Sequence, residues 1–126
     1  MNKIFATAKL KSLYPKVKAF VEEELHPTEL HLLKGDWSET EQILNAKRQM
    51  AKELGLWTPY LPEEEGGLGL TMVEFGQISE LLGTSVIGHY VLNCQAPDIG
   101  NIELLHQFAS GEIKETWLKP LMKGDI

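Results

Sequence analysis

Apolar residues recur at steps of three and four positions along almost the whole chain, and this spacing constrains the fold more than any other feature. Leu13, Val17 and Phe20 are one example. Such steps place side chains on one face of an α-helix, whereas a half-buried strand needs strict alternation of apolar and polar residues. No run of strand length in the sequence alternates in this way. The pattern therefore predicts an all-α fold.

Breaks in the pattern divide it into about six helices, which we expect to pack as an up-and-down orthogonal helical bundle. In the first helix Pro15 has no N–H to donate, so it is tolerated best in a first turn and Ser12 is the expected cap. His26-Pro27 is expected to end this helix, because the residue before a proline is disfavoured in α space. Residues 28–37 are then expected to form a connector.

Two serine or threonine residues stand three positions before a glutamate, a spacing typical of a capping box. In this motif the two residues satisfy each other's free N–H groups. Ser38 with Glu41, and Thr71 with Glu74, are therefore expected to open the second and third helices. The remaining helices are expected over 86–94, from a cap at Asp98 to Phe108, and from Glu112 onward, with Pro120 kinking or ending the last.

Three further expectations concern burial. Helix 86–94 is apolar nearly all round, so we expect it to be the buried one. The fifth helix is expected to face inward with Ile99, Ile102, Leu105 and Phe108, and the sixth to carry Ile113, Trp117 and Leu121 on one stripe. Residues 56–70 contain two prolines and three glycines, which exclude regular helix, yet they are too apolar for a solvated loop. We expect this segment to pack on the core.

Charge and cysteine content exclude several classes of protein. Acidic residues outnumber basic ones by 18 to 12, a net charge of −6, which argues against a nucleic-acid or anionic-membrane surface. The single cysteine, Cys94, excludes an intrachain disulfide framework and a multi-cysteine zinc site. No apolar run approaches the roughly 18 residues of a membrane span, and no secretory signal is visible. We expect a soluble cytoplasmic protein, or a mitochondrial or peroxisomal one in a eukaryote.

The candidate chemical motifs are weak. The glycines of residues 66–69 follow no strand, so we interpret them as turn positions and not as a phosphate cradle. Glu22, His26 and His31 lack the spacing of a zinc site, and Cys94 has no neighbour that would lower its pKa, so we expect a buried thiol. We therefore predict no catalytic residue, no cofactor-binding residue and no metal ligand. Asn93, Gln95, Asp98 and Asn101 either bond to the backbone or line a cavity.

Two stretches resemble the N-terminal helical domain of the acyl-CoA dehydrogenases. They are LGLW at 54–57 followed by LPEEEGGLGL at 61–70, and SGEIKETWLKPL at 110–121 followed by Gly124. Glu65 departs from the family, which usually has tyrosine there. NCQAPD at 93–98 is similar to the branch that includes the long-chain and 4-hydroxyacyl enzymes. The resemblance covers residues 13–126.

The resemblance implies a flavoenzyme that removes two hydrogens from the α and β carbons of an acyl-CoA. In that family a β domain and a helical C-terminal domain follow the N-terminal domain, hold the FAD between them and supply the glutamate base. We expect residues 1–126 to be a single helical domain, with those two domains absent and no catalysis by itself. Its expected partners are the missing domains or a chain that carries them, and acyl-CoA in the assembled enzyme.

In this family the N-terminal domain closes the end of the acyl-chain tunnel, and the resemblance assigns that role to Val91, Cys94, Gln95 and Asn101. The first three would share one helix face at steps of three and four. A second hypothesis is a free-standing helical protein-interaction module derived from the family. Either way, we expect self-association through apolar surface left on helix 86–94 and on residues 56–70.

Overall fold

The computed structural model describes residues 1, 4 and 6–126, and within this part of the chain every regular element is a helix. The elements form six continuous helical segments. The first runs through α1 (Ala8–Phe20), a π-helical turn η2 (Val21–Leu25) and α2 (His26–Leu32). Then come α3 (Trp37–Glu53), α4 (Met72–Leu82), α5 (Gly88–Val91) and α6 (Asp98–Phe108); α7 (Gly111–Ile113), a π-helical turn η4 (Lys114–Leu118) and α8 (Lys119–Lys123) form the sixth. The prediction of an all-α fold with six helices is confirmed.

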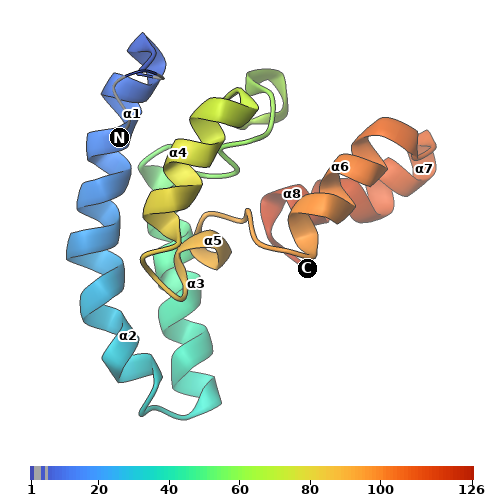
Figure 1. Cartoon of the computed structure of the whole chain (residues 1–126). Coiled ribbons are helices and arrows are strands. Elements are labelled where there is room, and N and C mark those ends of the chain that lie inside the picture. Colours follow the sequence, from blue (N-terminus) through green and yellow to red (C-terminus); the bar gives the residue numbers. More distant parts are fainter. Residues whose placement is uncertain (2–3, 5) are drawn as a thin grey trace.

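The molecule has two parts, which we call the body (residues 8–94) and the arm (residues 98–124). In Figure 1 the rod of α1 and α2 lies beside α3, and α4 packs against α1 with α5 beneath it. The arm is a helical hairpin in which α6 packs against η4 and α8, and it projects sideways from the body (Figure 1). A short 3₁₀ turn, η3 (Glu63–Glu65), lies in the segment between α3 and α4.

Two apolar clusters hold these parts together. The larger lies inside the body, where side chains such as Val17, Phe20, Ile78 and Leu82 are buried against one another. The smaller consists of Leu61, Ile102 and Leu118, and it joins residues 56–70 to the arm. Burial of Leu56, Leu61 and Leu70 confirms that the proline- and glycine-rich segment packs on the core.

The first helix is longer at both ends than predicted. It begins after Thr7, whose hydroxyl accepts a hydrogen bond from the Leu10 N–H at 3.1 Å, so Ser12 is not the cap. Pro15 lies inside α1 on its exposed side. At the other end the helix continues through Pro27 to Leu32, and the connector is correspondingly short.

Pro27 and Pro120 do not end their helices, because each follows directly on a π-helical turn. In an α-helix the proline ring meets the carbonyl four residues earlier. Before Pro27, the His26 N–H donates instead to the Val21 carbonyl, five residues back. Before Pro120, the Lys119 N–H donates in the same way to Lys114. The locally wider helix accommodates a residue that would otherwise break it.

Of the two predicted capping boxes, one forms. The Glu74 N–H donates to the Thr71 hydroxyl at 3.3 Å, and the Thr71 N–H donates to the Glu74 carboxylate at 2.8 Å. The second helix, however, begins at Trp37, one residue before Ser38. Asp36 caps it by accepting from the Glu39 N–H at 2.9 Å, so the expected Ser38–Glu41 box is wrong.

The last three helices differ in detail from the prediction. The fourth is a single turn, because helix ends at Val91 and Asn93 adopts a left-handed φ of 55°. Asp98 is the first residue of α6 and makes no side-chain cap. On α6 Ile102 is buried as predicted, but Phe108 is exposed. In the sixth segment Ile113 and Trp117 are exposed, whereas Leu121 is half-buried, so the three do not form one buried stripe. In the sixth segment the π-helical turn breaks the 3.6-residue period on which that expectation relied.

Across the described residues, no helix combines the length and the apolar character that crossing a membrane requires.

Candidate functional site

The four residues predicted to close an acyl tunnel fall into two environments. Val91 and Cys94 are buried in the main cluster of the body. Gln95 is half-buried in the turn before α6, and Asn101 is exposed on the first turns of α6. Val91, Cys94 and Gln95 do not share a helix face, because the helix has already ended and the chain reverses at Asn93.

Cys94 is a buried thiol, as predicted. Burial raises its pKa to about 12, because the ionised sulfur would lose its hydration. At neutral pH the side chain is therefore protonated. A thiol in this state is not a nucleophile, and it contributes apolar surface to the core.

Tyr60 is a feature of this region that sequence reasoning missed. Its ring packs against Phe75 at a centroid distance of 5.9 Å and contacts both apolar clusters. Its hydroxyl is buried and finds no hydrogen-bond partner among the described residues. Burial raises the pKa of this hydroxyl, and the neighbouring Cys94 adds to the effect. Buried polar groups without a partner are uncommon, so this hydroxyl marks the junction between body and arm as a place where a ligand group or water could bind.

A polar network around Arg48 fastens the arm to the body, and sequence reasoning missed it too. Arg48 is only 8% exposed, and its guanidinium lies between the rings of Trp57 and Tyr90, at 4.8 and 4.6 Å from their centroids. It donates to the Tyr90 carbonyl at 2.7 Å and to the Asn93 side-chain oxygen at 3.3 Å. A longer bond of 3.5 Å reaches the Gly124 carbonyl.

The polar residues near α5 were expected either to bond to the backbone or to line a cavity, and the structure decides between these alternatives for Asn93. Its side-chain amide donates to the carbonyls of Leu121 and Met122, at 3.0 and 3.4 Å. This amide therefore bonds to the backbone. Since Arg48 and Asn93 bond to each other and both reach the last residues of the arm, they act together as one clamp.

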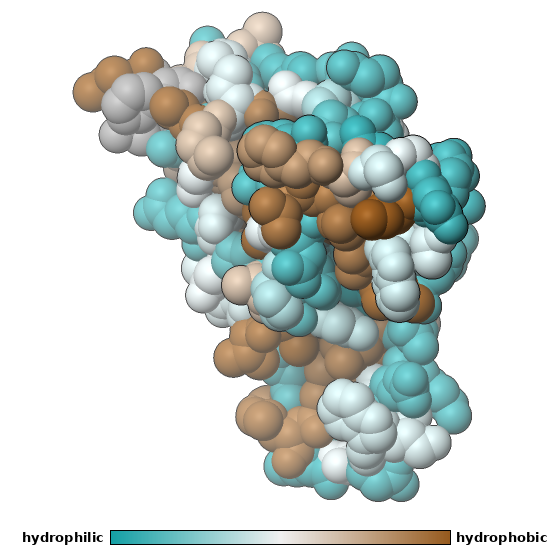
Figure 2. Space-filling model, turned by 90° about the vertical axis from the view of Figure 1, so that its right-hand side faces the viewer, coloured by the Kyte–Doolittle hydropathy of each residue, from teal (hydrophilic) through white to brown (hydrophobic). Residues whose placement is uncertain are grey.

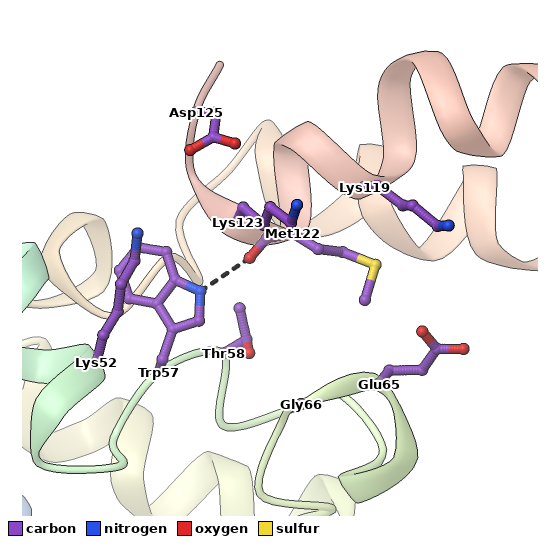
Figure 3. Close-up of a pocket in the computed structure, with 9 residues that line it drawn as sticks. All are labelled: Lys52, Trp57, Thr58, Glu65, Gly66, Lys119, Met122, Lys123 and Asp125. Atoms are coloured by element: carbon purple, nitrogen blue, oxygen red, sulfur yellow. Dashed lines mark hydrogen bonds between the residues drawn. The ribbon is translucent and has the colours of Figure 1, made fainter.

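A pocket of about 430 Å³ lies where the arm meets the body (Figure 3). The Trp57 ring forms one side, and its indole N–H donates to the Met122 carbonyl at 2.8 Å. The Lys52 ammonium lies over the same ring at 4.4 Å. Figure 3 shows Lys119 and Met122 projecting from α8 above Glu65 of the loop. The lining residues are Lys52, Trp57, Thr58, Glu65, Gly66, Lys119, Met122, Lys123 and Asp125, and they include none of the four predicted site residues.

The other chemical candidates are structural. Gly66 and Gly69 adopt left-handed φ values of 83° and 58°, which fits their interpretation as turn positions. The Ser79 hydroxyl and His89 Nε2 are 2.8 Å apart and connect α4 to α5. Burial lowers the pKa of His89. Within the described part of the chain, no three His, Cys, Asp or Glu side chains gather closely enough to hold a metal ion.

Exposed apolar side chains lie elsewhere than predicted. In helix 86–94 and residues 56–70 most large apolar side chains are buried, with Val86 the main exception. Figure 2, which looks at the side of the molecule that carries the arm, shows apolar residues as separate brown patches among polar ones. The exposed large apolar residues include Leu104, Phe108, Ile113 and Trp117 on the arm, and Leu30, Leu33 and Trp37 around the α2–α3 turn. The two segments predicted to mediate self-association thus expose little apolar surface, and self-association stays a prediction.

Comparison with known proteins gives concordant results. The pattern of the family described as acyl-CoA dehydrogenase, N-terminal domain, matches residues 7–125. Acyl-CoA dehydrogenase family member 10 of Mus musculus is 35% identical over 127 residues, which cover 93% of this chain and 12% of that protein. Family member 11 of Homo sapiens is 34% identical over 129 residues, covering 95% of this chain and 16% of that protein.

The fold has a close counterpart among solved structures. A structure from Mycobacterium abscessus assigned to the acyl-CoA dehydrogenases superposes with a TM-score of 0.87 at 35% sequence identity. The superposition covers 95% of this chain and 33% of that one. The chain thus spans less than a fifth of the length of the two curated relatives and a third of the solved structure.

Proposed function

Because this chain belongs to the acyl-CoA dehydrogenase N-terminal domain family, we propose that it is the N-terminal helical part of a flavoprotein that dehydrogenates acyl-CoA in fatty-acid oxidation. The observation that carries this proposal is the superposition over 95% of the chain on a protein of which it spans a third. In such an enzyme the catalytic base and the flavin belong to the other domains. This chain is then a binding and packing element and is not catalytic by itself.

The glycine-rich loop does not fit a flavin phosphate, which supports that division of roles. The glycine-rich loop would be the natural phosphate cradle, but its N–H groups are already bonded within the loop. Those of Gly66, Gly67 and Gly69 donate to the carbonyls of residues 63, 62 and 61, at 3.0, 3.0 and 2.8 Å. A phosphate needs such N–H groups to be free. We therefore derive no step of the reaction through this chain.

We further propose that Val91, Cys94, Gln95 and Asn101 form the base of the acyl-chain pocket. Val91 and Cys94 supply buried apolar surface, and Gln95 lies half-buried beside them. The unpartnered Tyr60 hydroxyl adds a polar point at the same junction. An apolar site with few polar groups suits a fatty tail.

The first experiment isolates the native protein from its source. We expect this chain to purify with a β domain and a second helical domain, on the same or another polypeptide. The preparation should carry FAD and reduce an electron acceptor when acyl-CoA is added. A native protein that contains this chain without any flavin-binding partner would refute the proposal.

The second experiment tests the pocket in that assembled enzyme. Gln95→Phe should lower kcat/KM for the longest acyl chains that the enzyme accepts by about tenfold or more, and leave shorter ones unchanged, the scale of discrimination in a hydrophobic pocket. Gln49→Phe on α3 is the matched control, since Gln49 is exposed and its side chain donates to Glu53 one turn along the same helix, at 3.0 Å. If Gln95→Phe lowers stability but leaves the chain-length profile intact, Gln95 has a structural role.

The alternative function is a free-standing helical interaction module derived from the family. The exposed apolar side chains of the arm favour it, because Phe108 is 76% and Trp117 55% exposed. In the leading proposal the same side chains would be covered by the other domains. For the compartment we propose the cytoplasm, or mitochondria or peroxisomes in a eukaryote, where a free thiol such as Cys94 stays reduced.

A further inference from the structure

The four residues proposed to form the base of the acyl-chain pocket come from two separate parts of the molecule. Val91 and Cys94 belong to the body, Asn101 belongs to the arm, and Gln95 lies in the turn between them. Residues 95–97 connect the two parts along the chain. The size of the pocket base therefore depends on how the arm is held against the body.

Apolar packing attaches the arm to the body but does not fix its angle. Leu61 of the body meets Ile102 and Leu118 of the arm in the smaller cluster. Beside this contact the junction is hollow, since it contains the pocket of about 430 Å³ that Figure 3 shows. Apolar attraction has no preferred direction. A contact of this kind, next to open space, would let the arm tilt unless other bonds held it.

Hydrogen bonds supply the direction that the apolar contact lacks. The Asn93 side-chain amide donates to the carbonyls of Leu121 and Met122, at 3.0 and 3.4 Å. The Trp57 indole N–H donates to the Met122 carbonyl at 2.8 Å. Hydrogen bonds weaken steeply as their angles depart from linear, so these bonds fix the orientation of α8 as well as its position. Because α8 packs against α6, they also fix the helix that carries Asn101.

The body side of this connection is held firmly. Asn93 lies inside segment 91–95, which carries the body half of the pocket base. Its side-chain oxygen accepts from the Arg48 guanidinium at 3.3 Å. Next to it, the Leu92 carbonyl accepts from the Thr58 N–H at 3.0 Å. Since the body half of the pocket base is bonded to the rest of the body, the arm is the half that can move.

We propose that Asn93, Arg48 and Trp57 are positioning residues that set the longest acyl chain the enzyme accepts, because they hold the arm at a fixed distance from segment 91–95. This inference rests on the proposed function. The three side chains act through the arm and through Asn101, so removing one of them changes the pocket without replacing a residue of its base. A loosened arm yields to added methylenes that a fixed base excludes.

Two substitutions each remove one donor to the arm. Asn93→Asp keeps an oxygen toward Arg48 and a residue type that tolerates the left-handed φ of 55°, but it loses the amide N–H that bonds to the arm. Trp57→Phe keeps an aromatic ring and removes the indole N–H. Val17→Ala is the matched control, since it opens a gap in the core of the body on α1, which lies on the opposite side from the arm in Figure 1.

The first measurement follows the arm in the 126-residue chain. Nitroxide labels on Gln49→Cys of α3 and Gln107→Cys of α6, both exposed, report the distance between body and arm by double electron–electron resonance. The buried Cys94 thiol does not compete for the label. We expect one narrow distance distribution, which Asn93→Asp and Trp57→Phe broaden or shift and Val17→Ala leaves unchanged. Circular dichroism checks that each variant is folded, and Trp57→Phe decides if Asn93→Asp is not.

The second measurement uses the same three substitutions in the assembled enzyme, with saturated acyl-CoA of increasing length. The ratio of kcat/KM between the longest accepted chain and one two carbons longer should fall about tenfold in Asn93→Asp and Trp57→Phe, the scale on which a hydrophobic pocket discriminates methylenes. Chains too short to reach the base should keep their kcat and KM. A merely structural role would reduce the amount of folded enzyme and leave the ratio as it is, which we expect for Val17→Ala.

Two results would overturn the proposal. One is a distance distribution that neither Asn93→Asp nor Trp57→Phe changes, and this result does not depend on dehydrogenase activity. The other is an unchanged kcat/KM ratio in an enzyme whose arm has moved, which would leave the proposed function intact. Failure of the proposed function is recognised separately, because the unsubstituted assembly would then lack flavin and would not oxidise acyl-CoA, and the inference would fall with it.

Discussion

Replacing Arg48 by methionine should loosen the arm, because methionine keeps the length of the buried stem but removes the guanidinium. The short bond to the Tyr90 carbonyl, 2.7 Å, and the bond to the Asn93 side chain would be lost, and both acceptors would stay largely buried. A bond to a charged donor contributes about 1.5–3 kcal/mol, and a partly desolvated cation–π contact about 1–2 kcal/mol.

Part of this loss is offset, since the buried charge no longer has to be desolvated. Burial of the guanidinium already lowers the pKa of Arg48, which shows that the desolvation is appreciable. We therefore expect the variant to lose about 2–4 kcal/mol of unfolding free energy. Urea unfolding followed by circular dichroism measures the change.

Lys52→Met is the matched control, because Lys52 contacts the same indole ring at 4.4 Å but is exposed. It should cost at most about 1 kcal/mol. Hydrogen exchange locates the effect: in Arg48→Met the amides of α6 and α8 should lose protection before those of α3. Equal destabilisation by the two substitutions, or uniform loss of protection, would refute the view that Arg48 clamps the arm.

Three further outcomes are expected. Pro15→Ala should raise the unfolding free energy by about 1–3 kcal/mol, because it restores a hydrogen bond inside α1, and a loss of stability in thermal unfolding would contradict that placement. The Cys94 thiol, whose pKa burial raises to about 12, should react with a disulfide reagent on the order of a hundredfold more slowly in the native chain than in urea. Burial lowers the pKa of His89 from its ordinary 6.5, so the unfolded state binds the proton more readily. The stability due to neutral His89 is present above pH 6.5 and is lost as the pH falls below it, and His89→Gln should flatten that part of the stability profile.

Most of the helical architecture could be predicted from periodicity, whereas helix ends that depend on hydrogen-bond pattern could not. The local residue types were enough to predict the capping box of Thr71 and Glu74, and also the burial of segment 56–70. The helix continuing through Pro27 and Pro120 could not be predicted, because a π-helical turn has no signal in single residues and yet removes the reason for a break. Asp and Ser are both good N-cap residues, so residue type alone could not decide between Asp36 and Ser38 as the start of α3.

The candidate site was less predictable, for a related reason. Burial of Val91 and Cys94 follows from their apolar surroundings, and the structure agrees. The position of Gln95 relative to Val91 and Cys94 could not be predicted in this way. It is set by the left-handed turn at Asn93, whose side chain bonds to residues 28 and 29 positions further along the chain. Arg48 shows the same limit: a charged residue in an amphipathic helix is expected to be solvated unless tertiary structure supplies aromatic rings and carbonyls around it.

The arm is attached to the body by bonds that end on main-chain oxygens. Trp57, Asn93 and Arg48 donate to the carbonyls of Met122, Leu121 and Gly124. Every residue type carries such an oxygen, so these bonds place no demand on which amino acids stand at 121 and 122. Gly124 is different, since its φ is 74° and a Cβ there would lie 2.3 Å from the Arg48 guanidinium. A helical hairpin of another sequence could therefore be grafted onto the same three donors, provided that it ends in glycine and keeps the apolar contacts that Ile102 and Leu118 make with Leu61.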